Sequence, residues 1–156
     1  MNTHKIFTFL AFYASTFVAA SSAAVWDVDG TWYQSLTQPS FTPPSWVFGP
    51  VWTILYLMIA IVAYRIAYAA QTPWKAPALA LWVLQIALNT LWTPVFFGAK
   101  NLGGAMFYIG LLWVTICLLI WVTCKVDRFS AILLLPYLAW VSFAGVLNFA
   151  FWSLNL

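Results

Sequence analysis

The chain has 156 residues, of which 65% are hydrophobic and 6% are charged, and its formal net charge is +3. Soluble domains carry about 25% charged residues, so this composition excludes an ordinary soluble protein. The basic residues follow the ends of long apolar runs, which membrane topology explains better than a nucleic-acid partner, and we expect no such partner. Eleven Trp, thirteen Phe and seven Tyr residues exceed what interfacial belts need. Many rings are therefore expected to face inward, around a flat, apolar ligand.

Five apolar runs are long enough to cross a bilayer, which takes roughly 20 helical residues. They predict helices at approximately residues 6–25, 46–66, 77–98, 102–124 and 129–153. A nearly continuous apolar run at residues 111–121 excludes a transmembrane β-barrel, whose strands alternate apolar and polar residues. The sequence therefore predicts an all-α membrane protein, a five-transmembrane-helix bundle that forms one domain over residues 1–156.

The first apolar run has a second interpretation. Lys5, the apolar stretch 6–18 and a run of small residues ending at Ala24 are also typical of a cleavable signal peptide. Against cleavage, the run stays apolar through Val25 and is long enough to span, and its removal would take a helix from the bundle.

The charges predict an orientation in the membrane. If the chain changes sides at each span, most of the basic residues lie on one face and only Lys100 lies on the other. Those on the shared face are Lys5, Arg65, Lys75, Lys125 and Arg128. By the positive-inside rule, the N-terminus is predicted to be cytoplasmic and the C-terminus to be outside.

The longest connection, residues 26–45, is a candidate lid over one end of the bundle. It opens with a turn signal at Asp27 to Gly30, and residues 31–36 could form a short interfacial helix. Pro39, Pro43 and Pro44 then stiffen the return to the second span. Long ordered loops in compact proteins are usually functional.

Three predicted spans contain a proline, namely Pro50, Pro94 and Pro136. Membrane helices tolerate such prolines when neighbouring groups satisfy the freed carbonyls. One interpretation is that the prolines only shape the packing of the helices. The other is that the kinked helices open a cavity at one end of the bundle.

Conventional catalytic and metal sites find little support. The one histidine, His4, lies in the N-terminal tail, and Cys117 and Cys124 lie together in a different helix, so no ligand cluster forms and we expect no metal centre. The acidic residues Asp27, Asp29 and Asp127 lie in loops without a histidine partner. No predicted span contains an acidic residue, which argues against an ion-coupled pump.

Three stripes at helical spacing remain, of which one is aromatic throughout and two combine aromatic with amide side chains. They are Phe48, Trp52 and Tyr56; Gln85, Asn89, Trp92 and Phe96; and Trp140, Ala144 and Asn148 with Leu147 alongside. An unpaired amide in hydrocarbon costs about 2–7 kcal/mol, so the amides must face protein or a cavity. Each stripe by itself could be a packed seam with the amides as interhelical bonds. Together with the candidate lid, the three stripes describe a pocket for an apolar ligand.

The stripes lie within motifs that cover most of the chain. These motifs are Trp32-Tyr33 with Leu36 and Pro39; Pro43-Pro44 with WVFGPVWT at residues 46–53 and Tyr56; NTLWTPVFFG at residues 89–98; and PYLAW at residues 136–140 with Leu147-Asn148. With these motifs the sequence resembles the TspO family, the tryptophan-rich sensory proteins related to the mitochondrial translocator protein. The resemblance extends from the first span to Asn155.

The resemblance implies five transmembrane helices, frequently a homodimer, and a pocket that binds porphyrins such as protoporphyrin IX, with no further cofactor required. The resemblance is carried over residue by residue onto this sequence. The pocket and lid residues that it implies, together with the stripe residues Tyr56 and Phe96, are the predicted ligand-binding residues. The implied pocket residues are Phe48, Trp52, Asn89, Trp92, Trp140, Ala144 and Leu147, and the implied lid residues are Trp32, Tyr33 and Pro43. Some bacterial relatives are thought to degrade protoporphyrin IX in light and oxygen, which implies a photochemical, catalytic role for Trp52 and Trp140.

Two positions depart from the family pattern. The end of the fifth span lacks the Tyr followed by Lys or Arg that is reported for sterol recognition in animal members, and Ser40 stands where some relatives carry a lid tryptophan. The expected function is binding of porphyrins and other flat, apolar ligands, as a sensor or in light-dependent degradation. The alternative is a transporter or regulatory-interaction protein for lipophilic ligands that performs no chemistry.

Overall fold

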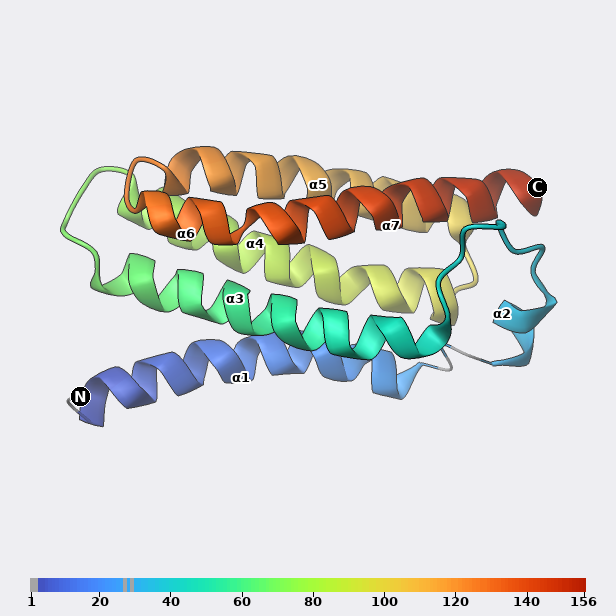
Figure 1. Cartoon of the computed structure of the whole chain (residues 1–156), viewed down its shortest axis with the longest axis horizontal. Helices are drawn as coiled ribbons and strands as arrows, with labels where there is room; N and C mark the ends of the chain where they lie inside the picture. The colour runs from blue at the N-terminus through green and yellow to red at the C-terminus, as the bar shows by residue number, and fades with distance from the viewer. Residues whose placement is uncertain (1–2, 27, 29) are drawn as a thin grey trace.

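The computed structural model describes residues 3–26, 28 and 30–156, except for the side chains of residues 22–24, and no strand occurs in this part of the chain. Its long helices run roughly parallel to one long axis (Figure 1). In chain order the elements are α1 (Thr3–Val25), α2 (Thr31–Ser35), the 3₁₀ turn η1 (Ser45–Val47), α3 (Phe48–Tyr68), α4 (Lys75–Thr93), the π-helical turn η2 (Pro94–Gly98), α5 (Leu102–Thr123), α6 (Arg128–Leu133) and α7 (Leu135–Leu154). The predicted turn residues Asp27 and Asp29 lie outside the described residues.

Four helical segments in the described part of the chain are long and apolar enough to cross a membrane. They are Ser45–Tyr68, Lys75–Gly98, Leu102–Thr123 and Arg128–Leu154. They coincide with the second to fifth predicted spans, and the all-helical fold class is confirmed. The 23-residue helix α1 occupies the first predicted span, and its passage through the bilayer, and with it the count of five, stays a prediction.

The helices pack around a core that is apolar along most of its length. Helix α4 packs against α5, α1 packs against both α3 and α4, and α5 packs against α7. Ile59, Ile66, Ile116 and Leu119 are fully buried between them. Large apolar side chains such as Trp121 point outward instead, which is the arrangement expected where the surrounding solvent is lipid.

The three prolines act differently from one another. Pro50 lies in the first turn of α3, where a backbone amide has no helical partner, so it does not interrupt the span as an internal proline would. Pro94 opens the π-helical turn η2 at the end of α4. The helix predicted at residues 129–153 is divided at Leu134 into α6 and α7, because Pro136 cannot donate the next intrahelical hydrogen bond.

The segment of residues 26–45 crosses one end of the bundle, beside the C-terminus of α7 (Figure 1). It contains α2, close to where the short helix was predicted. Asn155, just beyond α7, accepts a hydrogen bond from the backbone N–H of Thr37 at 2.8 Å and donates one to the Thr37 carbonyl at 3.0 Å. Both backbone groups of Thr37 are thereby tied to the end of α7.

Candidate functional site: an aromatic cavity at one end of the bundle

A cavity of about 730 Å³ lies at the end of the bundle that the segment 26–45 crosses. Its walls come from α1, α3, α4, η2, α5 and α7, and Pro43 and Tyr33 contribute from the crossing segment. Ligand sites for drug-sized molecules typically measure about 300–1,000 Å³. The cavity is therefore large enough for a small-molecule ligand.

The structure brings the predicted binding residues together with one exception. Those that line the cavity are Tyr33, Pro43, Phe48, Trp52, Tyr56, Asn89, Trp92, Phe96, Trp140, Ala144 and Leu147. Trp32 is not among the described lining residues. Its ring packs against Phe96, with 6.1 Å between the ring centroids, and the Lys100 ammonium lies 5.9 Å from the Trp32 ring.

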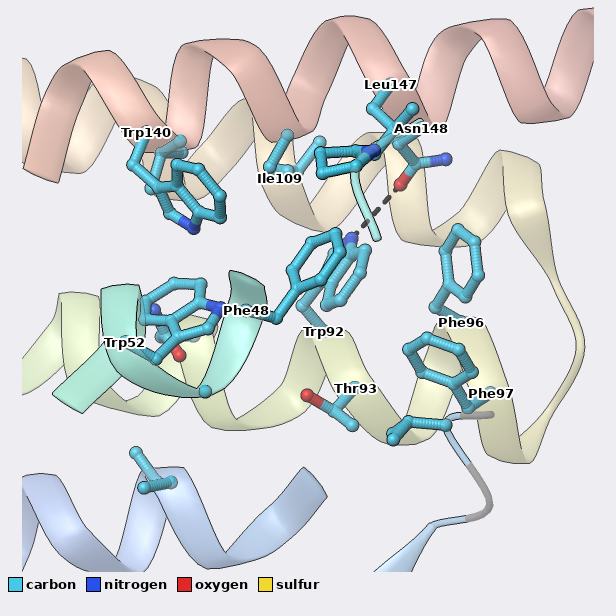
Figure 2. Close-up of a pocket in the computed structure, with 18 of the residues that line it drawn as sticks. Phe48, Trp52, Trp92, Thr93, Phe96, Phe97, Ile109, Trp140, Leu147 and Asn148 are labelled. Atoms are coloured by element: carbon cyan, nitrogen blue, oxygen red, sulfur yellow. Dashed lines mark hydrogen bonds between the residues drawn. The ribbon is translucent and has the colours of Figure 1, made fainter. Parts of the chain in front are cut away.

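Two indoles face each other across the cavity. Figure 2 shows Trp52 on α3 and Trp140 on α7, with their rings turned toward one another. The Trp52 ring stacks on Tyr56 at a centroid separation of 5.2 Å, and the Trp140 ring meets Phe48 edge-on at 5.8 Å. A flat, apolar molecule between these walls would find ring faces and edges on both sides.

A second group of rings closes the outer part of the cavity. Phe96 lies 4.7 Å from Phe97 and 4.9 Å from Trp92, between ring centroids, and Tyr33 packs on Phe97 at 5.6 Å. The tight spacing of Phe96 and Phe97 falls within η2, where the wider π-helical turn puts both rings on the wall (Figure 2). Pro94, which opens this turn, therefore shapes the wall of the cavity.

Hydrogen bonds fix the orientation of Trp92. Its indole N–H donates to Asn148 Oδ1 at 3.0 Å, the bond drawn in Figure 2. The Asn148 amide in turn donates to the carbonyl of Leu102 at 3.0 Å. Trp92 is thus held by a buried amide that is itself tied to the start of α5.

A chain of polar side chains runs into the core from the deep end of the cavity, which Tyr56 and Asn89 line. The Tyr56 hydroxyl donates to Asn89 Oδ1 at 2.8 Å, and Asn89 Nδ2 donates to the Tyr137 hydroxyl at 3.1 Å. Tyr137 then donates to Gln85 Oε1 at 2.8 Å. Gln85 and Asn89 are buried, which confirms that the two amides face the interior of the bundle.

The indole N–H of Trp140 has no such partner. Trp140 Nε1 is buried and forms no hydrogen bond among the described residues. A buried donor without a partner costs about 1–3 kcal/mol. Because Trp140 lines the cavity, a ligand that carries a carbonyl or carboxylate oxygen could accept this hydrogen bond.

Sequence reasoning missed the walls made by α1 and α5. Thr16, Ala19 and Ala20 of α1 and Ile109 and Leu112 of α5 line the cavity. Tyr13 and Phe17 of α1 also line the cavity, at helical spacing with Ala20, so a sequence signal for the α1 wall was present. Ile109 and Leu112 are aliphatic residues in a uniformly apolar helix, and no stripe distinguishes them from core residues.

The described residues contain no group of three or more His, Cys, Asp or Glu side chains that could hold a metal ion. The cavity walls carry rings, methyl groups, hydroxyls and amides, and none of the cavity-lining residues named above is ionisable at neutral pH. What this arrangement can do chemically is bind an apolar, aromatic molecule and offer it a few fixed hydrogen bonds.

Comparison with known proteins agrees with this architecture. The profile of the TspO/MBR family matches residues 6–153. The chain belongs to the TspO/MBR family. Together with its four apolar helices, this membership makes it an integral membrane protein.

Family relatives span bacteria, archaea and animals. The chain is 40% identical to Protein CrtK of Rhodobacter capsulatus over 151 residues, covering 94% of this chain and 92% of that protein. It is 37% identical to the tryptophan-rich sensory protein of Cereibacter sphaeroides over 147 residues, covering 94% and 90%. The human translocator protein is 36% identical over 126 residues, covering 80% of this chain and 75% of the human one.

Proposed function

We propose that this TspO/MBR protein binds porphyrins, with protoporphyrin IX as the type ligand, and other flat, apolar molecules. The observation that carries the proposal is the pair of facing indoles, Trp52 and Trp140, in an aromatic cavity of about 730 Å³. A macrocycle stacked between them would bury both faces. The unpartnered Trp140 N–H and the Asn89 amide would meet polar groups at its edge.

Light-dependent chemistry is the second part of the proposal. The cavity has no conventional catalytic group, so the ligand itself would supply the photochemistry and dioxygen would be the oxidant. Trp52 and Trp140 would be the catalytic residues, because an indole in contact with an excited porphyrin can donate an electron to it or react with the oxygen species that it generates. Binding without this chemistry would make the protein a sensor.

The test is a titration of purified protein with protoporphyrin IX, in the dark and under illumination. Tryptophan quenching reports binding, and porphyrin absorbance reports loss of the ligand. We expect saturable quenching in the wild type and a clear loss of affinity in the Trp52→Phe, Trp140→Phe double variant. The matched control is Trp121→Phe, which removes a lipid-facing indole that is 54% exposed and does not line the cavity.

Each outcome has a distinct meaning. Light-driven porphyrin loss in the wild type that disappears in the double variant, even at porphyrin concentrations that saturate its weakened site, supports photochemical degradation. Quenching without loss supports a sensor. No saturable binding in the wild type, or a double variant that behaves like the control in both channels, contradicts the proposal.

The alternative, transport of lipophilic ligands without chemistry, draws on the name translocator protein that the human relative carries. A cavity at one end of the bundle is compatible with it. Flux of protoporphyrin IX across sealed vesicles that contain the protein distinguishes transport from binding, because a sensor binds without net flux.

We also propose a homodimer and an orientation. Ala76 and Ala80, one turn apart on α4, are exposed to the surrounding lipid and would let a second copy approach closely. Helix α1 begins, α3 ends, α4 begins and α5 ends at the same end of the bundle (Figure 1), and this end carries most of the basic residues. That end is proposed to be cytoplasmic, and crosslinking in membranes and tag accessibility test the two proposals.

A further inference from the structure

A second depression lies on the outside of the bundle, between α3 and α7. This α3–α7 groove measures about 450 Å³. It is lined by Val51, Ile54, Leu55, Met58, Pro136, Ala139 and Trp140. Apart from the indole N–H of Trp140, none of these side chains carries a polar group, and Ile54 is 60% exposed on the outer surface of α3. The groove therefore suits an apolar occupant.

The groove lies at the depth of the hydrocarbon core. Ala139 is about 17 Å from Arg128 and about 22 Å from Leu154 along the helical segment that contains α6 and α7, at 1.5 Å per residue. The hydrocarbon core of a bilayer is about 30 Å thick, so Ala139 lies near its middle. The surroundings of the groove are lipid chains, in which an apolar ligand concentrates.

Only side chains separate the groove from the cavity. Trp140 lines both of them. Helix α3 packs its backbone closely against α1, α4 and α6 but not against α7, and two ring contacts in the described part of the chain join α3 to α7. Those ring contacts are Phe48 with Trp140 at 5.8 Å and Trp52 with Tyr137 at 6.3 Å, between centroids.

Trp140 can move without breaking a hydrogen bond. Its Nε1 atom has no partner in the described part of the chain, whereas Trp82 and Trp92 are each held by a hydrogen bond from the indole N–H. Rotation of the Trp140 side chain therefore costs packing contacts with its apolar neighbours but no hydrogen bond. Of these three indoles, Trp140 is the one without a hydrogen bond, and it lies between the groove and the cavity.

We propose that the α3–α7 groove is a vestibule, a lipid-facing site that receives apolar, aromatic ligands from the bilayer and passes them into the cavity when the Trp140 ring turns aside. The proposal rests on the proposed binding function and adds the path by which the ligand arrives. A ligand that has partitioned into the membrane would not need to return to water to reach its site.

The test measures rates and affinity separately. Proteoliposomes are mixed rapidly with protoporphyrin IX, and tryptophan quenching gives the association rate; transfer to empty vesicles gives the dissociation rate. Ala139→Trp fills the groove, and Ile54→Ala widens it, without changing a residue that lines the cavity. The control Val146→Trp adds the same bulk to an exposed position of α7 outside both sites.

We expect Ala139→Trp to slow association and dissociation alike, by about tenfold, because a blocked path raises one barrier for both directions. Ile54→Ala should accelerate both rates, and Val146→Trp should leave them unchanged. The dissociation constant should stay at its wild-type value in all three variants, which also shows that each variant is folded.

Three results would overturn the vestibule. They are rates in Ala139→Trp that match the wild type, an equal slowing in Val146→Trp, or a weaker affinity at an unchanged association rate. The first of these, with binding intact, leaves the proposed function standing and excludes only the path. Absence of saturable binding in the wild type instead contradicts the proposed function, and the vestibule is rejected with it.

Discussion

At the scale of single residues, the deep end of the cavity depends on Asn89. Its amide oxygen accepts from Tyr56 and its amide nitrogen donates to Tyr137, so one side chain joins α3, α4 and α7. Gln85 serves only one partner, because its Nε2 atom forms no hydrogen bond among the described residues. Removal of the Asn89 amide therefore leaves two tyrosine hydroxyls each short of a hydrogen-bond partner, whereas removal of the Gln85 amide affects one.

We predict that Asn89→Leu lowers stability by about 1–2 kcal/mol, because Tyr56 loses its acceptor and Tyr137 loses its donor. The matched control, Gln85→Leu, should lower stability by a smaller amount. This substitution deprives Tyr137 of an acceptor, but it also removes a buried amide that has an unpaired N–H group. Thermal denaturation in one detergent should rank the midpoints as wild type, Gln85→Leu and then Asn89→Leu, and the opposite order of the two variants would contradict this interpretation.

At the scale of elements, contacts with η2 and with the end of α7 hold the segment 26–45 over the cavity. Tyr33 packs on Phe97 and on Phe151, at centroid distances of 5.6 and 5.3 Å, and Asn155 bonds to both backbone groups of Thr37. The Asn155 amide also donates to the carbonyl of Phe151 at 2.8 Å, which orients it. One side chain at the end of α7 thus anchors the middle of the segment.

We predict that Asn155→Ala loosens the segment without unfolding the bundle. The variant loses two exposed hydrogen bonds to Thr37, each contributing about 0.5–1.5 kcal/mol, so opening of the segment should become at least about fivefold more frequent. Hydrogen exchange at residues 31–42 should accelerate, while exchange within α5 should not change. The control is Ser153→Ala, whose hydroxyl bonds only to the Ala150 carbonyl of its own helix. Equal exchange in both variants would show that Asn155 is not the anchor.

At the scale of the whole molecule, an ion pair joins parts of the chain that are far apart in sequence. The Arg65 guanidinium donates to Asp127 through Nε at 2.6 Å and through Nη2 at 3.2 Å. It also lies over the Phe129 ring, 4.8 Å from its centroid. The bond from Arg65 keeps the pKa of the Asp127 carboxyl below its usual range, with a further contribution from the Ser130 hydroxyl.

A lowered carboxyl pKa predicts a stabilisation that is present at neutral pH and is lost as the pH falls through the pKa of the folded state. Below about pH 4 the Asp127 carboxyl is protonated more readily in the unfolded chain than in the folded one, so the free energy of unfolding falls. We expect Asp127→Asn to be less stable than the wild type at pH 7, by less than about 1 kcal/mol because the pair is partly exposed. The difference between the denaturation midpoints of the two proteins should shrink as the pH falls, and a difference that is the same at pH 3 as at pH 7 would contradict the assignment.

Much of the fold could be predicted because the signals are local. A run of about 20 apolar residues must form a helix in lipid, and the predicted spans at 46–66, 77–98 and 102–124 coincide with observed helices to within a few residues. The stripes in α3, α4 and α7 also converge on the cavity, since helical periodicity decides which side chains share a face. The break at Leu134 was missed because a proline in a span can kink a helix or divide it, and its surroundings decide between the two.

Composition and periodicity act within one helix, so they are enough to predict that the chain is helical, that it lies in a membrane and that its aromatic and amide stripes face inward. The tertiary structure shows what those stripes face. It placed Trp32 behind the wall rather than on it, added α1 and α5 to the cavity and paired Arg65 with Asp127. It also left the Trp140 N–H without a partner. These features depend on the distances between helices. Those distances result from the packing of many side chains at once, and a local sequence pattern does not predict them.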